Sequence, residues 1–379
     1  MVQSEGPLLA RAHVAADEPQ ALATLAAGLG PGPFALVILF LSPQAPLAAL
    51  AAQSLTAFGD TPVIGCTTAG EISANGYAEG SIVAIGLPRA HFVTDPILIP
   101  DLSTLNRDQL IGQLIRARQA LSAKAPHWAH EFGFLLVDGL SLKEDELAFT
   151  LASGLGPVPF FGGSAGDGTD FGQTFILHQG KICANAAVLA LIRSDCRAHV
   201  FKLDHLHPSA RRMVVTSATP AARVVHQINA EPAAQEYARL LGKDPSQLTP
   251  FTFAAHPVLV RIGGQHHVRA IRQVAPNGDL IFFSAIDEGL VLTLAEPQDM
   301  VSHLSAGLEA LSRGGTRPSI LACDCLLRRV EAQEKQMTGA ISKLLRGHGV
   351  TGFSTYGEQM GGMHVNQTLT GVALYPPGS

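Results

Sequence analysis

Three glycine-rich turns contain the residues of this chain that are best suited to bind a ligand. The first, Gly65-Cys66-Thr67-Thr68-Ala69-Gly70-Glu71, and the third, Gly352-Phe353-Ser354-Thr355-Tyr356-Gly357-Glu358, are close copies, and Gly162–Asp167 is a looser one. Successive backbone N–H groups in such a turn can form an anion-binding concavity. Hydroxyls could add hydrogen bonds, and the carboxylates could pair with an amine. Each turn could instead serve only to join two strands.

The first and third turns predict a ligand-binding site, and their matching carboxylates predict a cleft shared by the two halves of the chain. The candidate ligand-binding residues of these turns are Cys66, Thr67, Thr68, Gly70, Glu71, Thr355, Tyr356, Gly357 and Glu358.

The middle turn raises a catalytic alternative. Gly162-Gly163-Ser164-Ala165-Gly166 matches the G-x-S-x-G pattern of hydrolases, in which a helix directly after the turn exposes the serine. Here Asp167–Gly172 follow, which are typical of a turn. Cys66 could also be a nucleophile, but no histidine lies near it in the sequence. We expect no catalytic residue and no enzyme, and we keep a hydrolase at Gly162–Gly166 as an alternative.

A cysteine pair gives a possible metal site. Cys323 and Cys325 would point to the same face of a strand. Structural zinc sites usually need a second pair of Cys or His residues, and no such pair accompanies these two. We therefore interpret both as small buried hydrophobic residues and predict no metal site.

Composition excludes several functions. Hydrophobic residues make up 47% of the 379 residues, which allows large cores, and the net charge is −5. Nucleic-acid binding needs clustered Lys and Arg, which this sequence lacks. The odd number of cysteines, five, favours reduced thiols in the cytoplasm. The N-terminus shows no signal peptide pattern, and Ser42-Pro43 interrupts the most apolar window, Phe34–Phe58, so we predict no membrane span.

The turns fall at one point of a repeated pattern of strand, helix, strand, turn and strand. Apolar strands begin at Phe34, Phe132 and Ile320, and the turn glycine follows 36 (34 to 70), 34 (132 to 166) and 37 (320 to 357) residues later. Near-constant spacing indicates internal pseudo-symmetry. In the last copy we expect one helix over Glu331–Arg346.

The mixture of elements predicts the fold class. Strands alternate with helices but short hairpins are frequent, so we predict an α+β fold with mixed sheets covered by helices. His207-Pro208-Ser209-Ala210 is typical of a linker. The predicted domains are residues 1–209 and 210–379.

The combination of motifs resembles the FIST family (F-box and intracellular signal transduction). The first turn resembles the hallmark of the FIST N-terminal domain. The motifs that resemble the FIST C-terminal domain are Pro232-Ala233, Tyr237, Leu241-Gly242, Cys325-Leu326-Leu327-Arg328, the third turn and His364-Val365-Asn366-Gln367-Thr368. Gln359–Met363 departs from the family pattern, because it is short and has no Pro. The resemblance adds Arg328, Asn366 and Gln367 to the candidate ligand-binding residues.

The resemblance implies a function. FIST proteins are regarded as intracellular sensors that bind small ligands such as amino acids and act on signalling partners. We therefore expect a cytoplasmic small-ligand sensor that acts through a separate protein, such as a histidine kinase or a cyclic-di-GMP enzyme, without nucleic-acid or membrane partners. One branch, the NosP-type proteins, binds haem and senses nitric oxide, which is the alternative. His364, expected at the exposed mouth of the third turn, would then be the candidate haem ligand. The sequence does not identify the cofactor.

Overall fold

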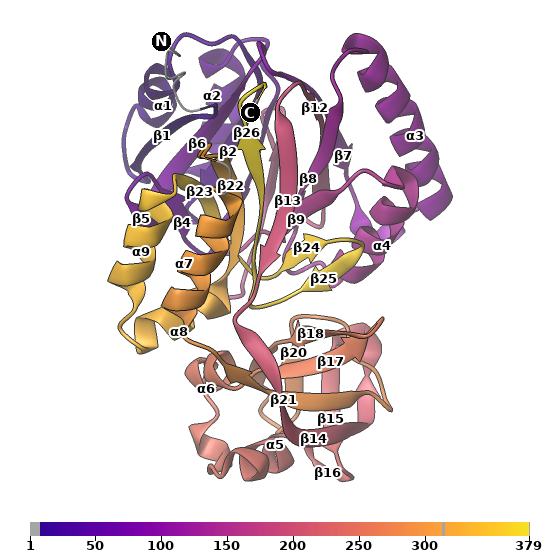
Figure 1. Ribbon diagram of the computed structural model, residues 1–379. Helices are drawn as coiled ribbons and strands as arrows, with labels where there is room; N and C mark the ends of the chain where they lie inside the picture. Colours follow the sequence, from indigo (N-terminus) through magenta and orange to yellow (C-terminus); the bar gives the residue numbers. More distant parts are fainter. Residues whose placement is uncertain (1–7, 313–314, 379) are drawn as a thin grey trace.

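The computed structural model describes residues 8–312 and 315–378, and these form three sheets built on one plan together with a smaller β region (Figure 1). The first repeat consists of β1 (Ala10–Ala15), α1 (Ala21–Leu29), β2 (Phe34–Leu41), α2 (Leu47–Ala57), β3 (Val63–Thr67), β4 (Glu71–Ser73), β5 (Gly76–Ala78) and β6 (Ser81–Pro88). The predicted strand–helix–strand–turn–strand unit is confirmed, and it gains a leading strand and helix.

The second and third repeats follow the same order. The second consists of β7 (Phe92–Ile99), α3 (Arg107–Lys124), β8 (His130–Val137), α4 (Glu144–Leu155), β9 (Phe160–Ser164), β10 (Ile176–His178), β11 (Lys181–Cys183) and β12 (Ala187–Ser194). The third consists of β13 (Arg197–Leu203), α7 (Met300–Leu311), β22 (Ser319–Cys325), α8 (Leu326–Glu334), α9 (Thr338–Gly347), β23 (Val350–Thr355), β24 (Glu358–Met360), β25 (Met363–Val365) and β26 (Leu369–Tyr375).

The repeats exchange hairpins in a cycle. Each sheet has a parallel pair in its middle, β2 with β3, β8 with β9, and β22 with β23. The hairpin that follows each turn leaves its own sheet: β4–β5 pairs with β23, β10–β11 with β3, and β24–β25 with β9. The sheet orders are therefore equivalent: β1-β6-β2-β3-β10-β11, β7-β12-β8-β9-β24-β25 and β13-β26-β22-β23-β4-β5. This exchange joins sequence-distant turns at one place.

The three sheets share a central core, and helices cover their outer faces. The central core contains residues from all three sheets. They include Phe40 and Phe353, whose rings stack with their centroids 4.4 Å apart. Helices α1 and α2 cover the first sheet, α3 and α4 the second, and α7 and α9 the third. Because β2 is buried on both sides, all eight residues of Phe34–Leu41 are apolar and buried. The α+β class with mixed sheets covered by helices is confirmed.

A β region is inserted into the third repeat, between β13 and α7, and lies below the three sheets in Figure 1. Its elements are β14 (Leu206–Thr219), β15 (Val224–Ile228), β16 (Glu231–Pro232), α5 (Ala233–Leu241), α6 (Pro250–Ala255), β17 (Val258–Ile262), β18 (Gln265–Arg269), β19 (Ile271–Val274), β20 (Leu280–Phe282) and β21 (Val291–Pro297). It has a hydrophobic core of its own. The division into residues 1–209 and 210–379 stays a prediction.

Two local predictions are wrong. His207–Ala210 is not a linker, because these residues lie in β14, which pairs with β21 despite an irregularity between Pro208 and Arg212. The helix predicted over Glu331–Arg346 is two helices, α8 and α9. Gln336 between them has a φ of +57°, a left-handed conformation that ends a helix.

No helix within residues 8–312 and 315–378 is both long and apolar enough to cross a membrane.

Candidate functional site

The three glycine-rich turns meet where the repeats exchange their hairpins. A backbone N–H of each turn donates to a carbonyl of another turn, so that the bonds run around a ring. These bonds are Ala69 N to Ser354 O (3.0 Å), Gly166 N to Thr67 O (3.0 Å) and Tyr356 N to Ser164 O (3.2 Å). The ring consumes backbone donors that the turns could otherwise have offered to an anion.

The two turn glutamates are buried and hydrogen-bonded inside their own repeats. Glu71 accepts bonds from the hydroxyls of Thr68 and Ser81, the latter at 2.8 Å, and from Ser81 N at 3.2 Å. Glu358 repeats this pattern with Thr355 and Thr368: the Thr368 hydroxyl lies at 2.7 Å and its N at 3.2 Å. We call each arrangement a hydroxyl–carboxylate bridge. The two bridges have no residue in common, and the cleft shared by the two carboxylates stays a prediction.

Burial changes the ionisation of these carboxyls. It raises the pKa of Glu358 to about 8, against the lowering effect of its bonds to Thr355 and Thr368. Burial likewise raises the pKa of Glu71. Glu358 is therefore largely protonated at neutral pH.

A cavity of about 210 Å³ lies beside the first turn. Its walls come from all three repeats: the first supplies the segment after β2, the turn and the β5–β6 connection, the second supplies part of the loop between β9 and β10, and the third supplies α8. The lining residues are Ser42, Pro43, Gln44, Thr68, Ala69, Gly70, Glu71, Glu79, Gly80, Gly168, Thr169, Leu326, Arg329, Val330 and Gln333. Leu326 and Val330 give it an apolar wall, while hydroxyls and charged groups form the rest.

Arg329 is the buried cation of this cavity. Its side chain is 5% exposed, and its Nη2 donates to Ala78 O at 3.0 Å and to Glu79 at 2.9 Å. Its Nε and Nη1 are buried and have no hydrogen-bond partner among the described residues. Gly70 makes room for the guanidinium, because a Cβ there would lie 1.8 Å from Nη1. The φ of Gly70, +121°, also favours glycine.

The arrangement can bind a small molecule that carries both charges. Nε and Nη1, which have no partner among the described residues, can each donate a charge-assisted hydrogen bond to a carboxylate or a phosphate. Glu79 is 70% exposed at the rim, close enough to Arg329 to accept its hydrogen bond, and can pair with an amine. The volume is below the roughly 300–1,000 Å³ of pockets for drug-sized ligands, so it suits a molecule of amino-acid size.

Comparison with protein families covers nearly all of this architecture. The FIST N domain matches residues 35–231, and the FIST C domain matches residues 233–361. The chain belongs to the FIST family. Its domains are therefore sensor domains of signal transduction. A search of curated proteins gave no significant match.

The FIST candidate residues fall into two groups. Thr68, Gly70 and Glu71 line the cavity. Cys66 instead lies in the central core, where burial raises the pKa of its thiol well above the usual value. Thr67 accepts a bond from Phe175 N at 3.0 Å and so fixes the incoming hairpin. Ligand binding by these residues stays a prediction.

Arg328 differs from its neighbour Arg329. It is 1% exposed, and its Nε donates to Asp324 at 2.7 Å while its Nη1 lies 3.0 Å from His205 Nδ1. These bonds give Arg328 a structural position inside the protein. The sequence motifs did not indicate Arg329, whose only signal was the Arg-Arg pair itself.

The candidates of the third turn lie against the inserted β region. Tyr356 donates its hydroxyl to Asp167 and to Gly168 O (3.1 Å). Asn366 accepts a bond from Ser284, and Gln367 donates to Ala254 O at 2.8 Å. The contacts of Asn366 and Gln367 hold the inserted region on the three sheets, whereas those of Tyr356 join the third turn to the loop between β9 and β10. Thr355, Gly357 and Glu358 also belong to this buried group, and their binding of a ligand stays a prediction.

His364 is not at an exposed mouth, as we had expected. It is 1% exposed, burial lowers its pKa to about 3, and its Nδ1 lies 2.9 Å from Gln359 Nε2. Its Nε2 has no partner among the described residues, but a Cβ at Gly357 would lie 2.6 Å from it. The packing around Nε2 therefore does not fit a porphyrin. Haem binding through His364 stays a prediction that would require these residues to move.

The residues considered for catalysis are buried. Ser164 is fully buried, accepts a bond from Gln359 at 2.9 Å, and is followed by a loop instead of a helix. This geometry does not meet the requirement of a hydrolase turn at Gly162–Gly166. Cys323 and Cys325 are buried at 0% and 1% exposure, as small hydrophobic residues would be.

Proposed function

We propose that this FIST protein senses a small carboxylate-bearing metabolite, of the free amino-acid class, in the cavity between the first turn and α8. The observation that carries the proposal is Arg329: a buried guanidinium in a cavity of about 210 Å³, with two nitrogens that no described residue partners. A buried cation without enough acceptors is costly, and a bound carboxylate would satisfy it.

The other walls of the cavity favour an amino acid over a simple anion. Glu79 at the rim offers a carboxylate to an ammonium group. Leu326 and Val330 offer apolar contact to a side chain. The Thr68 hydroxyl is engaged with Glu71, so it positions the turn and does not compete for the ligand.

Helix α8 connects the cavity to the inserted β region. Arg329 faces the cavity, and α6 of the inserted region packs against the same helix. Glu331, two residues further along α8, has its Oε2 2.9 Å from Nε2 of His205, which directly precedes β14. A ligand that draws the Arg329 side chain toward itself would therefore bias α8 and, through it, the inserted region.

A separate signalling protein would read this change. We infer a histidine kinase or a cyclic-di-GMP enzyme as the partner, because the resemblance to the family implies such partners. A cytoplasmic location agrees with the five cysteines, all of which are thiols.

The test measures thermal stability and calorimetric binding with free L-amino acids and with dicarboxylic acids as probes. At least one probe should bind the wild type. Arg329→Gln should lower the affinity for that probe by about 100-fold, because a buried charge-assisted hydrogen-bonded pair contributes about 2–3 kcal/mol. Lys343→Gln is the matched control, because it removes one exposed positive charge from α9. Equal binding by wild type and Arg329→Gln would contradict the proposal.

A further inference from the structure

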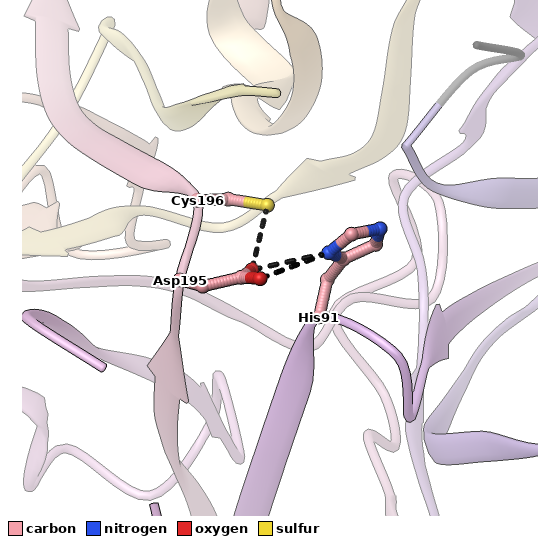
Figure 2. Close-up of side chains that lie close together, drawn as sticks. All are labelled: His91, Asp195 and Cys196. Atoms are coloured by element: carbon pink, nitrogen blue, oxygen red, sulfur yellow. Dashed lines mark hydrogen bonds and ion pairs between the residues drawn. The ribbon is translucent and has the colours of Figure 1, made fainter. Parts of the chain in front are cut away.

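A second group of chemically active side chains, none of which lines the cavity, lies at the connections between sheets. His91 follows β6 and directly precedes β7, so it joins the first sheet to the second. Asp195 and Cys196 form the connection between β12 and β13, which joins the second sheet to the third. Figure 2 shows that the three side chains converge although 104 residues separate His91 from Asp195.

The three side chains offer one nitrogen, one oxygen and one sulfur to a common point. His91 Nδ1 lies 3.1 Å from Asp195 Oδ1, and Cys196 Sγ lies 3.3 Å from the same oxygen. The ligand atoms all lie within 4.8 Å of one another. Around a tetrahedral zinc ion, with bonds of about 2.0 Å to N and O and about 2.3 Å to S, neighbouring ligand atoms lie roughly 3.3–3.7 Å apart. Small side-chain movements would therefore suffice to admit a metal.

The backbone holds the two connections in register. Ser194, the last residue of β12, donates its hydroxyl to His91 O at 2.7 Å and accepts a bond from Cys196 N at 3.0 Å. β7 and β12 pair along their whole length, from Ala187 with Ile99 to Ser194 with Phe92. The ligands therefore stand on strand ends that are fixed before any metal binds, which lowers the cost of ordering them.

Burial separates the roles of the ligands. Cys196 is fully buried, whereas the side chains of His91 and Asp195 are 28% and 30% exposed. A metal could enter from solvent through the histidine and the carboxylate and reach the thiol last. A mixed set of thiolate, imidazole and carboxylate favours zinc over magnesium or calcium, which prefer oxygen ligands.

We propose that His91, Asp195 and Cys196 form a zinc site with three protein ligands and a water molecule at the fourth position. Binding replaces the thiol proton with the metal: Cys196–SH and Zn²⁺ give Cys196–S–Zn⁺ and one proton, with no redox change. The bound ion would fasten the first-to-second and second-to-third sheet connections to each other.

The test uses the full chain without a polyhistidine tag, freed of metal by a chelator and titrated with Co²⁺ as a spectroscopic substitute and with Zn²⁺. We expect one ion per chain, a thiolate-to-cobalt charge-transfer band, and release of a proton. Cys196→Ser should abolish the band, while Cys183→Ser, at a half-buried cysteine outside the site, should keep it. His91→Ala should lower the affinity for zinc by more than about 10–100-fold. Substitution of residues that only hydrogen-bond to metal ligands already has an effect of that size.

The folding of the variants is checked by circular dichroism. If Cys196→Ser does not fold, His91→Gln and Asp195→Asn decide, since both change partly exposed side chains in turns. The proposal is overturned if the wild type shows no charge-transfer band, if the band survives in Cys196→Ser, or if folded His91→Gln and Asp195→Asn bind zinc as the wild type does.

Discussion

The second repeat differs from the first and third at the same three positions. In the first and third repeats a hydroxyl, a glutamate and a second hydroxyl form the bridge, as Thr68–Glu71–Ser81 and Thr355–Glu358–Thr368. Equivalent backbone bonds identify the counterparts in the second repeat as Ala165, Ile176 and Ala186. All three are fully buried. An entire polar bridge has thus been replaced by an apolar set.

The second repeat has a different carboxylate. Asp138, at the end of β8, accepts bonds from Thr174, Leu140 N and Asn185 N and holds the longer connection between β9 and β10. The turn glutamate is therefore one of two ways in which this protein holds a returning hairpin. A Gly-Glu turn in the sequence therefore indicates how the hairpin is held in place. The cation proposed to bind the ligand, Arg329, comes from another repeat.

The largest expected effect is the loss of one partner of a bridge. Glu358→Ala leaves two threonine hydroxyls and one backbone N–H buried without an acceptor, so we expect a loss of about 3–5 kcal/mol in the free energy of unfolding. Urea unfolding measures it. Glu309→Ala, on the exposed face of α7, should change stability by less than about 0.5 kcal/mol. A loss below that of ordinary surface substitutions would refute the structural role of the bridge.

The equivalence of the repeats can be tested by giving the first repeat the apolar residues of the second. Glu71→Ile alone should cost about 2–4 kcal/mol, because Thr68 and Ser81 keep unpaired hydroxyls. The triple variant Thr68→Ala, Glu71→Ile, Ser81→Ala should recover at least about half of that loss, since replacing both partners by apolar groups is nearly neutral. Urea unfolding of the single and triple variants decides. A triple variant less stable than the single variant would contradict the structural equivalence of these three positions in the two repeats.

The ionisation of Glu358 gives a pH dependence. Its pKa is about 8 in the folded protein and 4.5 in an unperturbed carboxyl, so between these values the folded state holds more protons. Its contribution to stability is therefore complete below about pH 4.5 and falls as pH rises toward 8, by at most about 1.4 kcal/mol per pH unit. Unfolding in urea between pH 5 and 8 should show this slope, and Glu358→Gln should flatten it. An unchanged slope in the glutamine variant would assign the titration to another group.

The smallest effect should come from adding one bridge hydroxyl to the second repeat. Ala186→Ser places a hydroxyl opposite Ile176, which cannot accept its proton, so we expect a loss of about 1 kcal/mol. Thermal unfolding against the wild type measures it, with Ala310→Ser on exposed α7 as the control. A stabilised Ala186→Ser variant would mean that the position is not the counterpart of Ser81 and Thr368.

Part of the candidate site followed from the sequence. Thr68, Gly70 and Glu71 were predicted from the turn motif and do line the cavity. Arg329 was not, because Arg328 and Arg329 are neighbours on α8, and successive helix residues point about 100° apart. Which of the two faces the cavity depends on how α8 lies against the first repeat. His364 was predicted to be exposed because the segment that covers it, the inserted region, lies about a hundred residues away in the chain.

The sequence by itself determined the elements and their repetition. An apolar run such as Phe34–Leu41 specifies a buried strand, and equal spacing of strand and turn specifies a repeat, since both are properties of short segments. Tertiary structure alone decided which sheet each hairpin joins, where the β region is inserted, and that His91 meets Asp195 and Cys196. Those choices depend on how three sheets share one core, and the free energy of that packing is spread over contacts between residues that no local pattern connects.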